Sequence, residues 1–132
     1  MNTMKSNLTS IRYLVKLREL IISYTNIQSD VDPLSSLVNL EYLNIEDNYG
    51  IAINNENEIV FQKLRKLEKF AGSRINFNSS SLSFLCHLKS LQLIILNGNN
   101  IKTSLPSCLG KLDRLTSIDM YHNQMTGSIP DS

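Results

Sequence analysis

Hydrophobic residues in this chain follow a compound spacing that fits neither a helix nor a strand alone. In LTSIDMYHNQMTGSIP, residues 115–130, apolar side chains alternate at Ile118 and Met120, and Leu115 lies three positions before Ile118. The alternating part predicts a short strand with one buried face, and the spacing of three predicts a helical or 3-10 turn. Because neither piece can bury its apolar side alone, the pattern predicts units that stack on one another.

The same pattern recurs along the chain, as L-x-x-L-x-x-L-x-L-x-x-N-x-L. Successive units are separated by 23, 27, 24 and 24 residues. The third leucine of the five units stands at Leu17, Leu40, Leu67, Leu91 and Leu115. A fixed period in this range predicts a solenoid of repeated strand-and-turn units.

These motifs resemble those of leucine-rich repeat proteins over nearly the whole chain. LDRLTSIDMYHNQMTGSIP, residues 112–130, resembles the plant-type repeat that ends N-x-L-x-G-x-I-P, and LPSCLGKL, residues 105–112, fits the same type. VDPLSSLVNLEYLNIEDN, residues 31–48, is closer to the short repeats of bacterial and intracellular eukaryotic members. The resemblance implies an α/β fold: a right-handed solenoid with a parallel β-sheet on its concave face and short helical or 3-10 returns on its convex face.

The spacing predicts the organisation of the chain. A partial N-terminal repeat or cap is expected at residues 1–13. Five units are expected at 14–36, 37–63, 64–87, 88–111 and 112–132, the last one incomplete. Their strands are expected at Glu19–Ser23, Tyr42–Glu46, Lys69–Ser73, Leu93–Asn97 and Ser117–Tyr121. The step of 27 places an insertion in NYGIAINNENEI, residues 48–59, which is expected to bulge out as a solvated loop.

Asparagines follow three of the expected strands, at Asn48, Asn99 and Asn123. A buried amide offers two donors and an acceptor to otherwise unpaired turn backbone, so these residues are expected to form a structural ladder along the solenoid. Thr25 can fill this role partially. Ile75 cannot, so the ladder is expected to break in the third unit.

Side chains that alternate with the buried positions are expected on the concave face. Leu93 and Ile95 are apolar there, and tyrosines, which are enriched in binding hot spots, lie on the same surface. The candidate ligand-binding residues are Tyr24, Tyr42, Asn44, Glu46, Lys69, Arg74, Leu93, Ile95, Asn97, Asp119, Tyr121 and His122. A protein or peptide is the expected partner; incidental variation of an exposed face is the alternative.

Catalysis is not predicted. The sequence contains no glycine-rich phosphate loop and no G-x-S-x-G motif. His122 lies near Asp119, but a nucleophile and a third group are missing, and His87 is expected to be exposed on the convex side. We therefore expect a non-catalytic binding module without cofactor or metal. The alternatives are a recognition fragment of a larger receptor, immune or effector protein, and a structural element that associates end to end.

Charge is divided between the two halves of the chain. Residues 19–58 contain eight acids and no Lys or Arg, whereas residues 63–114 contain nine bases and two acids. In a solenoid this division becomes an axial dipole, which favours end-to-end self-association or a partner of complementary polarity. The basic half lacks interleaved aromatic residues, so nucleic acid is not an expected partner.

The two cysteines, Cys86 and Cys108, are too few for a disulfide scaffold, and their spacing suits no common metal motif. Two reduced thiols are expected, with a single disulfide as the alternative. No apolar run is long enough to cross a membrane and the N-terminus lacks a signal-peptide core, so membrane insertion is not expected. A cytoplasmic location is favoured unless the chain is a fragment of a larger protein.

Overall fold

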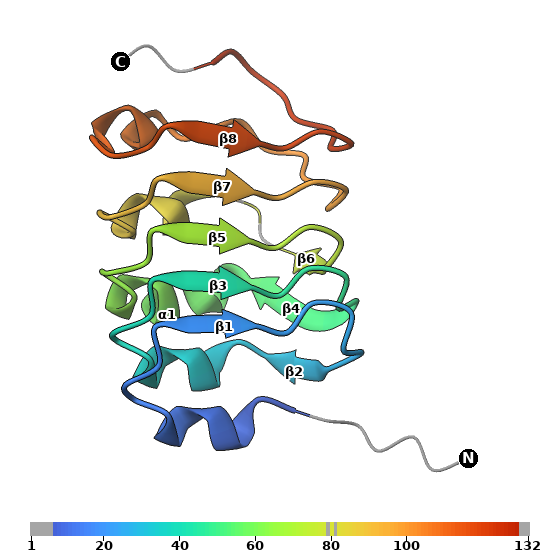
Figure 1. The fold of residues 1–132 in the computed structure, drawn as a ribbon. Helices are drawn as coiled ribbons and strands as arrows, with labels where there is room; N and C mark the ends of the chain where they lie inside the picture. Colours follow the sequence, from blue (N-terminus) through green and yellow to red (C-terminus); the bar gives the residue numbers. More distant parts are fainter. Residues whose placement is uncertain (1–6, 79, 81, 130–132) are drawn as a thin grey trace.

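The computed structural model describes residues 7–78, 80 and 82–129, which form a solenoid of stacked strand-and-turn units (Figure 1). One five-stranded sheet runs the length of the stack in the order β1-β3-β5-β7-β8. Its parallel strands are β1 (Glu19–Ile21), β3 (Tyr42–Asn44), β5 (Lys69–Ala71), β7 (Leu93–Ile95) and β8 (Ser117–Asp119). The expected leucine-rich repeat fold is confirmed. Parts of the expected cap, residues 1–6, and of the last unit, residues 130–132, lie outside the described residues.

Each strand begins at the residue expected from the sequence and ends two residues earlier. Main-chain pairing nevertheless continues beyond the strands: the Ile22 N–H donates to Asn44 O at 2.9 Å, and the Tyr24 N–H donates to Glu46 O at 3.1 Å. The residues just after each strand are therefore held in register with the neighbouring unit, although they are no longer extended.

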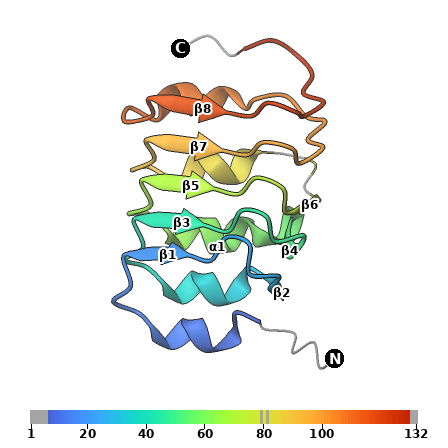
Figure 2. The same cartoon turned by 45° about the vertical axis from the view of Figure 1, so that its right-hand side comes forward.

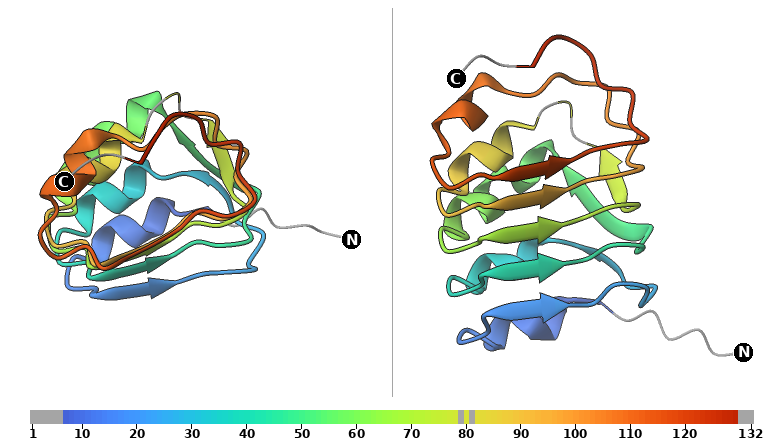
Figure 3. Two further views of the ribbon diagram at one scale, coloured as in Figure 1. Left: turned by 90° about the horizontal axis from the view of Figure 1, so that it is seen from above. Right: turned by 45° about the horizontal axis from the view of Figure 1, so that its top comes forward.

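Short helical segments return the chain behind the sheet (Figure 2). They are η1 (Thr9–Tyr13), η2 (Asp32–Ser36), α1 (Glu58–Lys63), η4 (Ser83–His87) and η5 (Ser107–Lys111). Each of these segments is followed directly by a leucine whose N–H bonds the carbonyl three residues back, as Leu37 does to Leu34 O at 2.9 Å. Seen along the stack, each unit is a loop with its strand on one side and its helical return on another (Figure 3).

The insertion at residues 48–59 is not a loop, so that expectation was wrong. It forms β4 (Gly50–Asn54) and η3 (Asn55–Asn57), and α1 follows directly. β4 lies between β2 (Gln28–Asp30) and β6 (Asn76–Asn78) in a second parallel sheet. Ile51 and Ile53 alternate with more exposed neighbours and are fully buried, which explains why the segment pairs as a strand.

The core fills the space between the main sheet and the helical returns. The inward strand residues Leu20, Leu43, Phe70 and Ile94 are buried, whereas Ile118, at the open end of the stack, is 40% exposed. In the middle units the core is aromatic: the Phe61 ring centroid lies 4.5 Å from that of Phe84 and 5.7 Å from that of Phe70.

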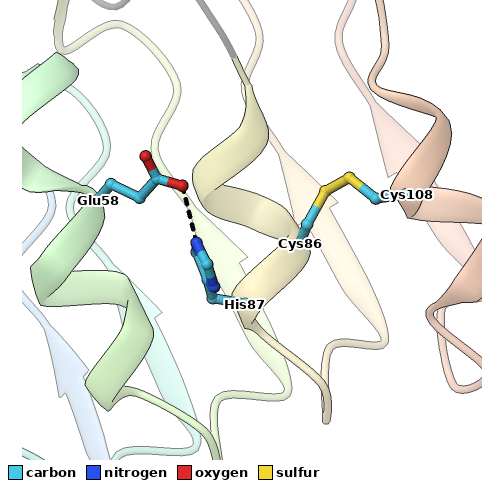
Figure 4. Close-up of a disulfide and its surroundings, with 4 residues drawn as sticks. All are labelled: Glu58, Cys86, His87 and Cys108. Atoms are coloured by element: carbon cyan, nitrogen blue, oxygen red, sulfur yellow. Dashed lines mark hydrogen bonds and ion pairs between the residues drawn. A yellow bond between two sulfur atoms is a disulfide. The ribbon is translucent and has the colours of Figure 1, made fainter.

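Cys86 and Cys108 form a disulfide, which corrects the expectation of two reduced thiols (Figure 4). Cys86 lies in η4 and Cys108 in η5, and their Cα atoms are 5.8 Å apart. That separation suits a disulfide, and it arises because the two helical returns lie side by side in consecutive units. The bond ties the last described return to the one before it.

His87, next to this disulfide, differs from the freely exposed histidine expected. Its Nε2 lies 2.8 Å from Oε1 of Glu58, at the start of α1, and its side chain is only 34% exposed (Figure 4). The contact joins α1 to η4.

Among the helices of the described residues, none has the length and apolar content needed to cross a membrane.

Candidate functional site

The outward face of the main sheet brings the candidate residues of different units into rows. Strand register aligns Tyr42 with Lys69 and Lys69 with Leu93, and it aligns Asn44 with Ala71 and Ala71 with Ile95. Because the units stack without a shift, each outward position forms a row that crosses the strands. These rows follow from the repeat period and match the alignment expected from the sequence.

The first row combines aromatic, cationic and apolar groups. Lys69 Nζ lies 5.9 Å from the centroid of the Tyr42 ring, a cation–π distance. Asn44 Nδ2 donates to the Tyr42 hydroxyl oxygen at 3.3 Å, and the Glu46 N–H donates to Asn44 Oδ1 at 3.1 Å. These contacts fix the Tyr42 ring and leave Lys69 exposed beside it.

Apolar side chains occupy the adjacent part of the face. Leu93 and Ile95 are partly exposed on β7, and Ile21 is 56% exposed on β1. In the row that joins Ile21 to Ile95, the residues between them are the half-buried Asn44 and Ala71, which is only 2% exposed and forms a shallow apolar floor beside Ile95. This arrangement can bury apolar groups of a ligand without rearranging the core.

Asn97 is a buried member of the candidate set. It is 5% exposed, and its Oδ1 accepts a hydrogen bond from the Tyr121 N–H at 2.9 Å. Its own N–H donates to Oγ of Ser73, itself 1% exposed, at 3.1 Å. Asn97 therefore positions the backbone of Tyr121, which is 57% exposed, and presents little surface of its own.

A flanking row follows directly after the strands and adopts left-handed backbone in every unit. The φ angles are 58° at Tyr24, 57° at Asp47, 51° at Arg74, 66° at Gly98 and 55° at His122. This conformation turns the chain after each strand, and exposure differs along the row: Tyr24 is 75% exposed, whereas the Asp47 side chain is 10% exposed. Non-glycine residues adopt it at an energetic cost, which the hydrogen bonds around the turn offset.

Three of these flanking side chains form a charged network. Arg74 Nη2 donates to Asp47 Oδ2 at 2.7 Å, and Arg74 Nε donates to Asp47 Oδ1. The hydrogen bond from Arg74 lowers the pKa of the Asp47 carboxyl group, and a second bond from Tyr24 adds to the effect. The same pair raises the pKa of Arg74. Arg74 is thereby committed to Asp47, although its side chain remains 39% exposed.

At the C-terminal end of the face, the Tyr121 and His122 rings meet edge to face with centroids 4.9 Å apart. Asp119, in β8, is half-buried in the row of Ile95 and Asn44. His122 and Asp119 do not form an ion pair among the described residues. No group of three His, Cys, Asp or Glu side chains in the described part of the chain could hold a metal ion.

The asparagines behind this face hold the turns together. Asn48 Nδ2 donates to the carbonyl oxygens of Ile22, Ile45 and Glu46, and its Oδ1 accepts from the Ile27 N–H at 3.1 Å. The bond to Ile22 crosses to the preceding unit, so each asparagine serves two turns.

The other two asparagines repeat this arrangement. Asn99 Nδ2 donates to Gly72 O at 2.7 Å and its Oδ1 accepts from the Ile75 N–H at 3.0 Å, so Asn99 supplies partners to the third unit, which has Ile75 in place of the asparagine. Asn123 Nδ2 donates to Leu96 O at 2.8 Å, and its Oδ1 accepts from the N–H groups of Asn99 and Ile101.

Asp47 is absent from the candidate site residues expected from the sequence. The sequence feature that could have identified it is a carboxylate in one unit and a basic residue at the equivalent position of the next unit. The pair is visible only after Asp47 and Arg74, 27 residues apart, are aligned by the repeat period.

Comparison with protein families agrees with this geometry. The family described as "Leucine Rich repeats (2 copies)" matches residues 15–72, and "Leucine Rich Repeat" matches residues 90–112 and 114–132. The chain belongs to the leucine-rich repeat family. The repeats themselves are non-catalytic.

The relatives of this leucine-rich repeat chain are much longer proteins. It is 34% identical over 126 residues to Receptor-like protein 33 of Arabidopsis thaliana, an alignment that covers 87% of this chain and 13% of that protein. The chain therefore spans only a small part of this curated relative.

Two solved structures illustrate the similarity of fold. The crystal structure of PEPR1-AtPEP1 superposes on this chain with a TM-score of 0.81 at 23% identity, over 92% of this chain and 17% of that chain. The plant peptide hormone receptor RGFR1 in complex with RGF2 superposes with a TM-score of 0.70 at 22% identity over 92% of this chain and 23% of that chain.

Proposed function

We propose that this leucine-rich repeat module is the recognition segment of a larger receptor-like protein and that it binds a peptide or protein segment on its concave face. Its similarity to a receptor-like protein along nearly its whole length supports a receptor context. Two proteins of the same fold are described as complexes, one of them a peptide hormone receptor, which supports a peptide as ligand.

The observation that carries the proposal is the row of Tyr42, Lys69 and Leu93 beside the apolar Ile95. Aromatic, cationic and aliphatic groups alternate across three strands there, with Tyr42 held by Asn44. A rigid aromatic anchor surrounded by apolar floor and polar groups is the composition of a binding hot spot. A ligand lying across the strands would contact one residue of each unit in turn.

The two ends of the face add further aromatic surface. Tyr24 is 75% exposed at one end and Tyr121 is 57% exposed at the other. Both are positioned by turns rather than by the strands, and tyrosine contributes large contact area at low conformational cost. We assign the specificity of binding to these end positions and the bulk of affinity to the central row.

We also propose that the module acts on the oxidising side of the secretory pathway, in place of the cytoplasmic location favoured from the sequence. The Cys86–Cys108 disulfide supports this, because stable disulfides persist in secreted proteins and are rare in the cytosol. The receptor-like relative supports it independently.

A displayed random-peptide library tests the binding proposal. Peptides selected on the wild-type chain are measured again with a Leu93→Asp/Tyr121→Ala variant, and their Kd is expected to rise about tenfold or more. The matched control is Val38→Asp/Tyr13→Ala, which alters exposed side chains outside the sheet. Equal losses in both variants, or undiminished binding to the concave-face variant, would refute the assignment to the concave face.

End-to-end association is a second candidate function, favoured by apolar surface at both ends of the stack. A hollow at the first unit is lined by Ile11, Ile22 and Ile27, and one at the last described unit is lined by Ile118 and Met120, among others. Sedimentation velocity at low and high salt tests this candidate. A monomer at every concentration and salt level would eliminate it.

A further inference from the structure

A second surface, separate from the concave face, follows the turns that lead from the helical returns into β5, β7 and β8. In Figure 1 these turns form the edge at which the arrows begin. Each return ends in a basic residue, at Lys63, His87 and Lys111. Further bases follow within three residues. We call this surface the basic edge and define it by Lys63, Arg65, Lys66, Lys89, Lys111 and Arg114.

The basic edge is strongest in the last three units. At the equivalent positions, the first two units carry one base, Lys16, beside exposed Tyr13, Val15 and Val38, at 78%, 48% and 47% exposure. Much of the positive charge in the second half of the chain is therefore concentrated on one edge of the folded molecule. Asp113 is the one acid at these repeat positions in the three basic units.

All six cations of the basic edge are exposed, and none takes part in the ion pairs found among the described residues. The nearby Glu58 contacts His87. Lys66 donates to the Asn39 side chain at 2.8 Å, which orients it without neutralising it. Because these six bases outnumber the acids beside them, Asp113 and Glu41, the row is repulsive in the free protein, and an anionic ligand relieves that repulsion.

The centre of the basic edge is hollowed. Gln62, Arg65, His87 and Lys89 line a depression of about 330 Å³ between the third and fourth units. The hydrogen bond between His87 and Glu58 and the disulfide of the adjacent Cys86 fix its base, so its shape is held by contacts between three consecutive returns.

We propose that the basic edge binds a linear acidic polysaccharide, with a carboxylate of one sugar seated between Arg65 and Lys89. The edge is charged and hydrophilic and has no exposed apolar or aromatic side chain among the described residues 62–66, 87–90 and 111–114. Protein hot spots and single-stranded nucleic-acid sites add aromatic or apolar anchors to charge, and interfacial membrane helices add inserted apolar groups; these bases lack such anchors. A hydrophilic polymer with regularly spaced carboxylates requires only the bases and hydrogen-bond donors present.

Polygalacturonate is the probe, and its methyl ester is the uncharged control polymer. Binding of the intact chain to polygalacturonate is expected to weaken as salt is raised, since screening acts on exposed charges. The variant Lys63→Gln/Arg65→Gln/Lys89→Gln is expected to raise the Kd by about tenfold or more, as loss of several ionic contacts does in other polyanion complexes. The charge-conserving variant Lys63→Arg/Arg65→Lys/Lys89→Arg is expected to bind within about threefold of wild type.

The matched control is Arg12→Gln/Arg18→Gln/Lys102→Gln, which removes the same charge from exposed positions that are not equivalent to any base of the basic edge. Equal weakening in this control and in the edge variant would overturn the proposal, as would equal binding of the methyl ester. Tighter binding to an acidic peptide, a single-stranded oligonucleotide or phosphatidylserine vesicles would assign the edge to that class of partner instead and overturn the polysaccharide. None of the substitutions touches the concave face, so failure here leaves peptide binding there intact.

Discussion

Arg74 and Asp47 form a two-bond ion pair that crosses from one repeat to the preceding one, with Arg74 Nη2 2.7 Å from Asp47 Oδ2. Both residues lie in left-handed turns just after their strands. The pair therefore joins the two turns on which the edge of the concave face depends. It also gives the fold an acid-sensitive contact.

The pair predicts how stability responds to acid. Because Arg74 lowers the folded-state pKa of Asp47, the stabilisation is fully present above the unfolded-state pKa of about 4. It is lost as the pH falls through the lower folded-state pKa. Arg74→Gln should raise the pKa of Asp47 towards its ordinary value in an NMR titration of the carboxyl carbons. Arg18→Gln, which removes the partner of Glu41, is the control and should leave the pKa of Asp47 unchanged.

The disulfide predicts a redox-dependent stability. The bond joins residues separated by 22 positions, and closing a loop of this size contributes about 3 kcal/mol to the free energy of unfolding. Urea unfolding of Cys86→Ser/Cys108→Ser should show a loss of that order. Dithiothreitol should destabilise the wild-type chain by a similar amount and leave the double variant unaffected. A wild-type chain whose unfolding is insensitive to dithiothreitol would contradict the prediction.

Mutation of Asn99, which bonds the backbone of the third unit, is predicted to have a large effect on stability. Asn99 is 4% exposed, and Asn99→Ala leaves Gly72 O and the Ile75 N–H without these partners. The free energy of unfolding should fall by about 2–4 kcal/mol, since each unpaired buried group costs 1–3 kcal/mol. Thr25→Ala, at the exposed end of the ladder, should cost less than about 1 kcal/mol. Equal losses at both positions would contradict a special role for Asn99.

Gly98 predicts a backbone effect beside the charged network. Its φ of 66° disfavours a side chain, and a Cβ atom there would lie 3.1 Å from Arg74 Cγ. Gly98→Ala should lower the unfolding free energy by about 1–2 kcal/mol in urea denaturation. Asn100→Gly, which relieves a φ of 56°, is the opposite control and should be neutral or stabilising.

Much of the architecture was predictable because the same sequence pattern recurs in every repeat, so each expected position is supported by several units. The position of the first strand residue in all five units, the rows across the sheet and the identity of the inward residues follow from one aligned period. The concave candidates could be placed in rows for the same reason. Their binding role is a prediction.

The structure of the insertion was predicted wrongly because it occurs in one unit only, so no other repeat could be compared with it. The alternation of Ile51 and Ile53 was present in the sequence, but β4 becomes a strand only by pairing with β2 and β6 of the neighbouring units. Strand formation there depends on partners more than 20 residues away, which local spacing does not reveal.

The sequence by itself determined the repeat, its inward leucines and the order of side chains across the sheet, because burial of one strand face imposes a local period. Only the tertiary structure decided which side chains pair between units: Cys86 with Cys108, His87 with Glu58 and Arg74 with Asp47. These contacts depend on the depth and orientation at which consecutive returns and turns stack. That stacking is a property of the whole solenoid, and no single unit encodes it.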